Sequence, residues 1–443
     1  MQRNLTQGPI GKSLVLFSLP MIAGNLLQQL YNVADTLIVG KVIGATALSA
    51  VGSSYALMVL LTSVILGLCM GSGVVFAQLY GAGRIDEMKR SICNAFFFIL
   101  GVSALINLLA FLLLEQFLVW LNIPSEAAEY TRQYLRIIFA GMSFVSIYNF
   151  FASILRSVGN TLAPLIFLAV SAVTNVVLDL VLILCFQMGV AGAAWATVIA
   201  QALSAMCISL YFFTKAPFLR PSRRHFQLHR RSLQSIVTNS VLTALQQSIM
   251  NFGILMVQGL VNSFGFAASA AFAAVVKIDA FAYMPAQDFG NAFATFIAQN
   301  HGAGSTERIH RGMRTAGLLS CGFCLLSSAL VCLSARPLML LFVQPQETEI
   351  IRIGVEYLHI EGAFYLGIGL LFLLYGYYRG LGRSMMSIVL TVISLGSRVL
   401  LAYLLSALPA VGMVGIWWAI PIGWFLADVT GLCCYWKGRR GAM

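Results

Sequence analysis

The sequence comprises 443 residues, of which 59% are hydrophobic and only 9% are charged. This composition excludes an ordinary soluble domain, because too few polar side chains are available to cover a water-exposed surface. The net charge of +12 could indicate a nucleic-acid partner. However, the basic residues lie in short loops between long apolar stretches, so we expect no nucleic-acid partner.

Long apolar stretches predict the secondary structure, because about 20 apolar residues cross the hydrocarbon core of a bilayer as a helix. We therefore predict an all-α integral membrane protein with twelve transmembrane helices. In chain order the predicted spans are 14–38, 49–78, 91–114, 130–155, 162–184, 189–213, 236–262, 268–298, 310–334, 353–378, 384–406 and 411–436.

The two halves of the chain repeat each other. Gly81-Ala82-Gly83 recurs as Gly302-Ala303-Gly304, and Tyr134-Leu135 recurs as Tyr357-Leu358. Two homologous six-helix bundles are therefore expected, and an even number of helices gives both the same orientation. Their pseudo-two-fold axis should then lie along the membrane normal, as in some secondary transporters. The predicted parts are an amino-terminal lobe at 1–214, a cytoplasmic linker at 215–235 and a carboxy-terminal lobe at 236–443.

Positive charge is distributed unevenly between the two ends of the predicted spans. If the N-terminus is cytoplasmic, most of the 27 lysine and arginine residues lie on the cytoplasmic side, as the positive-inside rule requires. Twelve spans then place both termini in the cytoplasm. The linker at 215–235 is the most basic stretch, and we interpret it as a topology anchor, with a lipid-binding patch as the alternative.

The sequence contains no motif for ATP-driven transport or for catalysis. No loop is long enough to fold as a nucleotide-binding domain, and no Gly-x-x-x-x-Gly-Lys-Ser/Thr motif or nucleophile–base set occurs. The nine cysteines lie in or beside apolar spans, without the partners that would complete a metal set. We therefore expect neither an enzyme nor a bound cofactor, and assign the cysteines to packing.

Ionisable side chains at membrane depth are energetically costly and are candidates for function. In the first half these are Asp35 in the first span and Asp179 in the fifth. Both spans run outward, so the two carboxylates should lie at similar depth, with Thr197 of the sixth span at the same level. Helical spacing predicts two polar stripes facing the bundle interior, formed by Gln28, Asn32 and Asp35 and by Ser171, Asn175 and Asp179.

No lysine or arginine of the first half lies at the depth of Asp35 and Asp179, so the two carboxylates require a proton or a metal cation. Two nearby carboxylates in a low dielectric do not both ionise easily, so one of them could load and release a proton. Alternatively, oxygen atoms of Asp35, Asn175, Asp179 and Thr197 could bind Na⁺. Water-bridged packing between helices is the third interpretation.

The second half carries charges of both signs at membrane depth. Lys277 and Asp279 are two residues apart, so they should point to different sides of a helix. Glu361 and Arg398 fall at comparable depth, where a direct ion pair and a role in transport are alternative interpretations. The candidate cavity or ion-pair residues of this half are Gln247, Asn251, Lys277, Asp279, Tyr283, Asp288, Glu361 and Arg398.

Prolines fall inside four of the predicted spans, at Pro20, Pro164, Pro285 and Pro421. Each can kink its helix. A kink at Pro20 would let protonation of Asp35 change the shape of the first span, and a fixed bend is the alternative.

Taken in order, these features resemble those of the multidrug and toxic compound extrusion (MATE) family over essentially the whole chain. The resemblance implies that Asp35, Asn175, Asp179 and Thr197 form the amino-lobe cation site of the DinF-like branch. Other branches carry an acidic residue in the seventh span, where this chain has Gln246 and Gln247, so their carboxy-lobe cation site is not expected here. The resemblance is carried by the six-plus-six spans, the stripe Gln28, Asn32 and Asp35 followed by Val39-Gly40, both Gly-Ala-Gly strings, Arg156 with Gly159, and Asn175 with Asp179.

The resemblance implies export of amphipathic, often cationic organic compounds across a prokaryotic cytoplasmic membrane, coupled to H⁺ or Na⁺ and working by alternating access. We expect small organic molecules and membrane lipids as partners, and a monomeric protein. The alternative is a flippase of lipid-linked precursors, in which Lys277 and Arg398 would bind a pyrophosphate. The unpaired Asp35 and Asp179 favour the cation-coupled antiporter.

Overall fold

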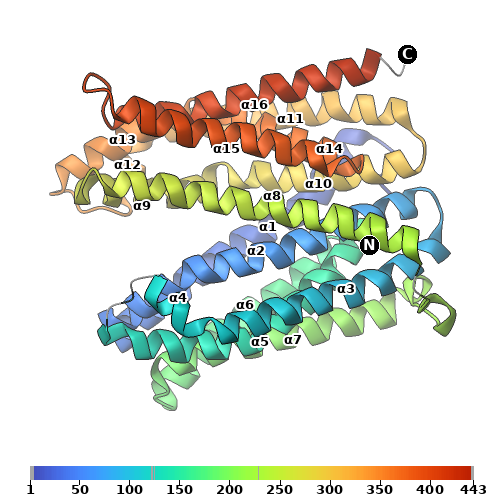
Figure 1. Cartoon of the computed structure of the whole chain (residues 1–443), viewed down its shortest axis with the longest axis horizontal. Helices are drawn as coiled ribbons and strands as arrows, with labels where there is room; N and C mark the ends of the chain where they lie inside the picture. Colours follow the sequence, from blue (N-terminus) through green and yellow to red (C-terminus); the bar gives the residue numbers. More distant parts are fainter. Residues whose placement is uncertain (1–3, 121–122, 124, 228, 441–443) are drawn as a thin grey trace. The chain divides into compact units, whose positions relative to one another are not determined.

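The computed structural model describes residues 4–120, 123, 125–227 and 229–440, and every regular element within these ranges is helical. Arg3, one of the residues behind the predicted topology, lies outside them. The helices (Figure 1) are α1 (Ile10–Ile38), η1 (Val39–Ile43), α2 (Ala45–Gly81), α3 (Ile85–Leu112), α4 (Leu114–Trp120), α5 (Ser125–Ser157), α6 (Leu162–Leu180), η2 (Val181–Cys185), α7 (Gly189–Lys215), η3 (Pro217–Leu219), η4 (Arg223–His225), α8 (Arg230–Asn262), α9 (Phe266–Ala282), α10 (Met284–Gly302), α11 (Thr306–Leu333), α12 (Ala335–Leu340), α13 (Thr348–Gly362), α14 (Tyr365–Gly380), α15 (Ser384–Ser406) and α16 (Val414–Arg440).

The predicted number of spans agrees with the structure once two broken helices are counted. Ten helices within the described residues are long and apolar enough to cross a membrane by themselves, and two bent pairs bring the number to 12. The pair α9 and α10 bends by 43°, and the pair α13 and α14 bends by 52°. The chain is therefore an all-α, multi-pass integral membrane protein.

The predicted prolines account for only one of the two bends. Pro285 lies in the first turn of α10, where a proline can start a helix but cannot continue the preceding one. The bend between α13 and α14 contains no proline and follows Gly362. Pro20 and Pro421 lie inside continuous helices, and neither position is a break.

The structure divides into two compact units. The first contains residues 19–244, and the second contains Leu5–Ser18 together with Leu245–Met443. These units differ from the predicted lobes in two places, because the start of α1 belongs to the second unit and α8 is shared between both. Side-chain and backbone contacts explain both differences.

A close helix crossing holds the first half of α8 in the first unit. A Cβ atom placed on Gly67 of α2 would lie 2.3 Å from Cα of Ala244, and one on Gly71 would lie 2.3 Å from the Asn239 carbonyl oxygen. The Ser240 hydroxyl donates to the Leu68 carbonyl oxygen at 2.9 Å. Small residues at this spacing let the two helix backbones approach closely, as is common between membrane helices.

The start of the chain is held in the second unit by backbone hydrogen bonds. The Arg308 guanidinium donates to the carbonyl oxygens of Leu5, Gln7 and Gly8. The amide nitrogen of Leu5 donates to the Gln299 side chain at 3.1 Å. A charged donor with three carbonyl acceptors fixes this segment more firmly than a neutral hydrogen bond would.

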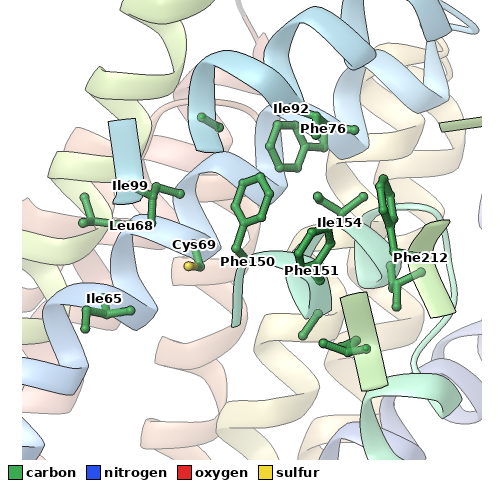
Figure 2. Close-up of a cluster of buried hydrophobic side chains, with 14 of the residues drawn as sticks. Ile65, Leu68, Cys69, Phe76, Ile92, Ile99, Phe150, Phe151, Ile154 and Phe212 are labelled. Carbon is green, nitrogen blue, oxygen red and sulfur yellow. The ribbon is translucent and has the colours of Figure 1, made fainter. Parts of the chain in front are cut away.

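The apolar core of the first unit lies between α2, α3, α5 and α7 (Figure 2). Figure 2 shows phenylalanine rings from α2, α5 and α7 close to one another, and ring centroids of Phe76 and Phe150 are 6.3 Å apart. Phe151 and Phe212 lie 5.0 Å apart. Such tilted and edge-on ring pairs supply packing and electrostatic complementarity, which fixes α5 against its neighbours.

The predicted linker folds onto α3 through a buried histidine. His225 of η4 is 1% exposed, and its Nε2 atom lies 3.2 Å from Asp86 Oδ1. Its Nδ1 atom accepts a hydrogen bond from the Ser222 backbone amide at 2.9 Å. Arg224 also pairs with Asp86. The linker is thus ordered by specific polar contacts within the first unit, in addition to carrying positive charge.

Replacing Gly71 with alanine should destabilise the first unit, because the new methyl group would collide with the Asn239 backbone. We expect a loss of about 1–3 kcal/mol, as for other overpacked sites, measured as a lower thermal unfolding temperature in detergent. Gly101→Ala is the matched control, since nothing lies within 4 Å of its added Cβ atom. An unchanged unfolding temperature in Gly71→Ala would contradict the close crossing.

Removing the His225 side chain should release the linker from α3. We expect His225→Ala to speed tryptic cleavage after Arg223 or Arg224 several-fold, because the segment loses both its cap at Ser222 and its contact with Asp86. His229→Ala, at an exposed neighbouring position, should leave the cleavage rate unchanged. Equal rates in the wild type and His225→Ala would show that the contact does not order the linker.

Candidate functional site

Asp35 and Asp179 lie at equivalent places, each just before a helix changes its winding. Asp35 is in the last turn of α1, which continues as the π-helical turn η1, and Asp179 is in the last turn of α6, which continues as η2. Short π-helical segments are rare and occur often at functional sites. The two π-helical turns also contact each other, which brings the ends of α1 and α6 together.

An apolar cluster encloses these helix ends. Val39 of η1, Ile183 of η2 and Tyr134 of α5 are each at most 5% exposed and belong to the same buried cluster. Residues Val190, Ala193 and Val198 place α7 against it. Polar groups in this region are therefore shielded from bulk water, which strengthens any electrostatic interaction among them.

Hydrogen bonds align α6 with α7 beside the carboxylates. Asn175 Nδ2 donates to Thr197 Oγ1 at 3.3 Å, and Thr197 in turn donates to the Ala193 carbonyl oxygen at 3.1 Å. One turn earlier, the Ser171 hydroxyl donates to the Ala200 carbonyl oxygen at 3.0 Å. Because the amide nitrogen of Asn175 is used in this way, its carbonyl oxygen is left to face other groups.

Four buried acceptor oxygens of this region have no hydrogen-bond donor in the described structure. They are Asp35 Oδ1, Asn175 Oδ1, Asp179 Oδ1 and Asp179 Oδ2. The Asp35 and Asp179 carboxyl groups act on each other electrostatically, and two ionised carboxylates cannot hydrogen-bond to each other because neither has a proton to donate. The set fits a shared proton or a small cation, since either one would supply the missing positive partner.

Tyrosine side chains complete the surroundings of the two carboxylates. Tyr134 is 3% exposed and interacts electrostatically with both Asp35 and Asp179, and Tyr31 interacts with Asp35. Sequence reasoning used Tyr134 only as a marker of the repeat and did not place it near the site. The match between Tyr134 and Tyr357 in the repeat was the sequence signal that could have identified Tyr134 as a residue near the site.

The predicted stripe on α1 is only partly directed inward. Asp35 and Asn32 are half-buried, whereas Gln28 is exposed and interacts with Tyr31 one turn later. No residue between Asn25 and Ile38 is fully buried. Within the described structure Gln28 is therefore not buried, and its role beside the site stays a prediction.

The second unit contains a separate polar cluster at its two helix breaks. Asp279 lies in the last turn of α9 and Glu361 in the last turn of α13, and Tyr365 begins α14. Tyr365 donates its hydroxyl proton to Asp279 Oδ1 at 2.5 Å. Tyr283, in the break before α10, stacks near Tyr365 with ring centroids 6.0 Å apart. Broken membrane helices commonly build polar sites in this way.

Arg398 of α15 belongs to this cluster but does not form a direct ion pair. Its charge acts on both Asp279 and Glu361. Among the ion pairs within 4.0 Å in the described residues, however, none includes Arg398, and both Arg398 Nε and Glu361 Oε2 lack a hydrogen-bond partner. The direct Glu361–Arg398 ion pair considered from the sequence is therefore not formed.

The other charged candidates of the second unit lie in different surroundings. Lys277 is exposed, and its Nζ atom lies 6.0 Å from the ring centroid of Phe342, while Asp279 on the same helix is buried. The two side chains thus point to different sides, as predicted. Asp288 is buried in α10 at 4% exposure.

Two further candidates, Gln247 and Asn251, lie on α8. Asn251 donates to the Gln247 carbonyl oxygen of its own helix at 3.2 Å. Both residues are half-buried, whereas Gln246 is 2% exposed. A side chain that bonds to its own helix backbone needs no partner on another helix, so this bond does not indicate a cavity.

Removing the hydroxyl group of Tyr365 should destabilise the protein, because Asp279 would stay buried without this hydrogen-bond donor. We expect Tyr365→Phe to lower the stability of the protein by about 1.5–3 kcal/mol, the range for hydrogen bonds to charged groups, measured by thermal unfolding in detergent. Tyr403→Phe on α15, at a 49% exposed position, is the matched control. Equal unfolding temperatures for the two variants would argue against the Tyr365–Asp279 bond.

Comparison with known proteins supports the repeat directly. A family model described as MatE matches the chain twice, over residues 20–181 and 242–404. The probable multidrug resistance protein YpnP of Bacillus subtilis is 31% identical, with 99% of this chain and 98% of YpnP covered. The probable multidrug resistance protein YoeA of the same organism is 26% identical, with coverage of 93% and 90%.

Solved structures reproduce the fold over nearly the whole chain. A transporter of the MOP superfamily from Pyrococcus furiosus superposes with a TM-score of 0.92 at 23% identity, covering 98% of this chain and 97% of that one. At this level of identity the agreement concerns the fold alone. The assignment to the DinF-like branch is not addressed by these comparisons and stays a prediction.

Proposed function

We propose that this chain, which belongs to the MatE family and is a membrane transporter rather than an enzyme, exports amphipathic organic compounds in exchange for H⁺ or Na⁺. Proteins named multidrug resistance proteins are its relatives. The observation that carries the coupling is the group of buried acceptor oxygens on Asp35, Asn175 and Asp179 without a donor. We place the chain in a prokaryotic cytoplasmic membrane, as a monomer with both termini in the cytoplasm.

The charge of the site supports cation coupling. Burying an ionised carboxylate without a partner costs several kcal/mol, so the pair Asp35 and Asp179 is stable only when a positive charge enters. No ion pair within 4.0 Å in the described part of the chain includes either residue. An exchangeable proton or Na⁺ held by Asp35, Asn175, Asp179 and Thr197 therefore meets the electrostatic requirement.

The position of Asp35 in a loosely packed helix suggests how binding drives transport. Residues 25–38 of α1 bury no side chain completely, so this segment can change position at low cost. A cation that draws Asp35 towards Asp179 would fix the end of α1 against η2, and loss of the cation would release it. Alternating access then follows from two arrangements of α1, one favoured by the cation and one by the exported compound.

The driving force is sufficient for export. Each elementary charge that crosses the membrane potential contributes about 2.3 kcal/mol per 100 mV. One or two cations entering for each organic molecule leaving would thus maintain a concentration gradient of that molecule. Apolar and aromatic side chains, with few polar groups, suit amphipathic substrates of varied shape.

The flippase alternative is weakened by the placement of its two cationic residues. Lys277 is exposed beside Phe342, whereas Arg398 is buried beside two carboxylates. The two side chains do not form a common basic site for a pyrophosphate. The antiporter is accordingly the better supported of the two functions.

A flux assay in proteoliposomes tests the proposal. Protein is reconstituted with a fluorescent organic cation, and an imposed proton gradient is compared with a sodium gradient. We expect one gradient to drive efflux and Asp35→Asn to lower the rate at least tenfold, because the site loses one of its two charges. Glu126→Gln removes an exposed carboxylate at the start of α5 and should retain the wild-type rate.

The outcomes distinguish the proposed coupling from its alternatives. If one gradient drives efflux in Glu126→Gln and the same gradient drives none in Asp35→Asn, Asp35 belongs to the coupling site. The gradient that drives efflux then identifies the coupling ion. Gradient-driven efflux at the wild-type rate in Asp35→Asn would contradict the site. Absence of flux under both gradients, across a panel of organic cations, would contradict the exchange itself.

A further inference from the structure

The internal repeat matches two residues beside the first polar cluster with two residues of the second. The offset that matches Tyr134 with Tyr357 also matches Asn175 with Arg398. Both tyrosines are fully buried and lie next to a carboxylate pair, Tyr134 near Asp35 and Asp179 and Tyr357 near Asp279 and Glu361. At the position where the first unit has an amide, the second unit therefore has a permanent positive charge.

The second carboxylate pair is buried as deeply as the first. Asp279 is 3% exposed and Glu361 is 2% exposed, and the two carboxyl groups act on each other electrostatically. Each also has a tyrosine partner, Tyr365 for Asp279 and Tyr357 for Glu361. Tyr357 is held in place between Phe272 and Trp417, with ring centroids at 5.7 and 4.2 Å.

The charges of the two clusters do not balance in the same way. In the first unit two carboxylates have no fixed cation, so the whole compensation must come from outside the chain. In the second unit Arg398 supplies one positive charge, and one proton bound by the Asp279–Glu361 pair supplies the other. With Arg398 and one bound proton, the second cluster is thus neutral and needs neither a second proton nor a metal cation.

The missing side chain at Gly423 lets α16 approach α15 closely at Arg398. A Cβ atom added to Gly423 of α16 would lie 2.4 Å from the Ser394 carbonyl oxygen and 3.3 Å from Cβ of Arg398. Arg398 is only 8% exposed, and its Nε atom has no hydrogen-bond partner. An arginine buried at this depth without a direct partner is costly, so its charge must be compensated by the nearby carboxylates.

We propose that Arg398 is a tethered counter-ion, which takes the place of an exchangeable cation in the second unit and confines ion exchange to the first. The inference rests on the proposed function, because it assumes that Asp35 and Asp179 hold the coupling ion. It makes Arg398 a residue that determines how many cations are exchanged per transport cycle, although it touches neither the ion nor the exported compound.

Counting bound ions in purified protein tests this role. The coupling ion identified by the flux assay is titrated calorimetrically, as H⁺ or as Na⁺, into the wild type and into three variants: Asp35→Asn, Arg398→Asn and the double variant. The wild type should bind through the first unit alone, so Asp35→Asn should lose binding. Arg398→Asn places an amide where the first unit has Asn175. This variant should bind about one more ion per chain than the wild type, because one negative charge of the Asp279–Glu361 pair loses its compensating guanidinium.

The double variant gives the sharpest comparison. Asp35→Asn combined with Arg398→Asn should recover ion binding that Asp35→Asn alone has lost, now located at Asp279 and Glu361. Arg398→Lys keeps the positive charge and should show no gain. The stability of Arg398→Asn should also rise with the concentration of the ion more steeply than that of the wild type, since the ion replaces the lost guanidinium.

Each outcome tests either the role of Arg398 or the proposed function on which that role rests. Ion binding in the wild type that survives Asp35→Asn and disappears in Glu361→Gln would overturn the inference, because the second unit would then exchange ions in spite of Arg398. A folded double variant without regained binding would overturn it as well. If Arg398→Asn fails to fold, complete loss of binding in Asp35→Asn still supports the inference and residual binding contradicts it. Absence of ion binding in the wild type would instead contradict the proposed function.

Discussion

Carboxylates buried in a membrane protein must be neutralised, and this requirement governs the arrangement of both units. Each unit contains one close pair, Asp35 with Asp179 and Asp279 with Glu361. Leaving two negative charges together in a low dielectric would cost several kcal/mol, a large fraction of the net stability of a folded protein. In the proposed function an exchangeable cation balances the charge of the first unit, whereas the second unit has Arg398 within the chain.

Interruptions in the helices create the space for these polar groups. In the first unit the spans of Asp35 and Asp179 end in π-helical turns, and in the second the spans of Asp279 and Glu361 bend by 43° and 52°. Irregular backbone at membrane depth has unsatisfied polar groups of its own and is tolerated only where it is enclosed by protein. The buried carboxylates and the irregular backbone are both costly at membrane depth, and here they share one enclosed region.

Sequence patterns predicted the fold well and the surroundings of the sites less well. Apolar stretches and the repeat identified twelve spans because hydropathy acts over about 20 residues, and helical spacing placed Asn175 beside Asp179. The 52° bend after Gly362 and the exposure of Gln28 depend on contacts between helices distant in the sequence. The sharing of α8 between units was likewise not predictable, because it arises where Gly67 and Gly71 meet the α8 backbone.

The two units together have the asymmetry that a coupled transporter requires. If both clusters exchanged ions independently, binding in one would not determine the state of the other, and ions could leak without transport. If Arg398 fixes one cluster, as we propose, Asp35 and Asp179 are the pair whose charge changes, and Asp35 lies on a part of α1 that has no fully buried residue. The start of that same helix is held in the second unit through Arg308. One helix therefore begins in the unit that contains Arg398 and ends at Asp35 of the proposed exchange site.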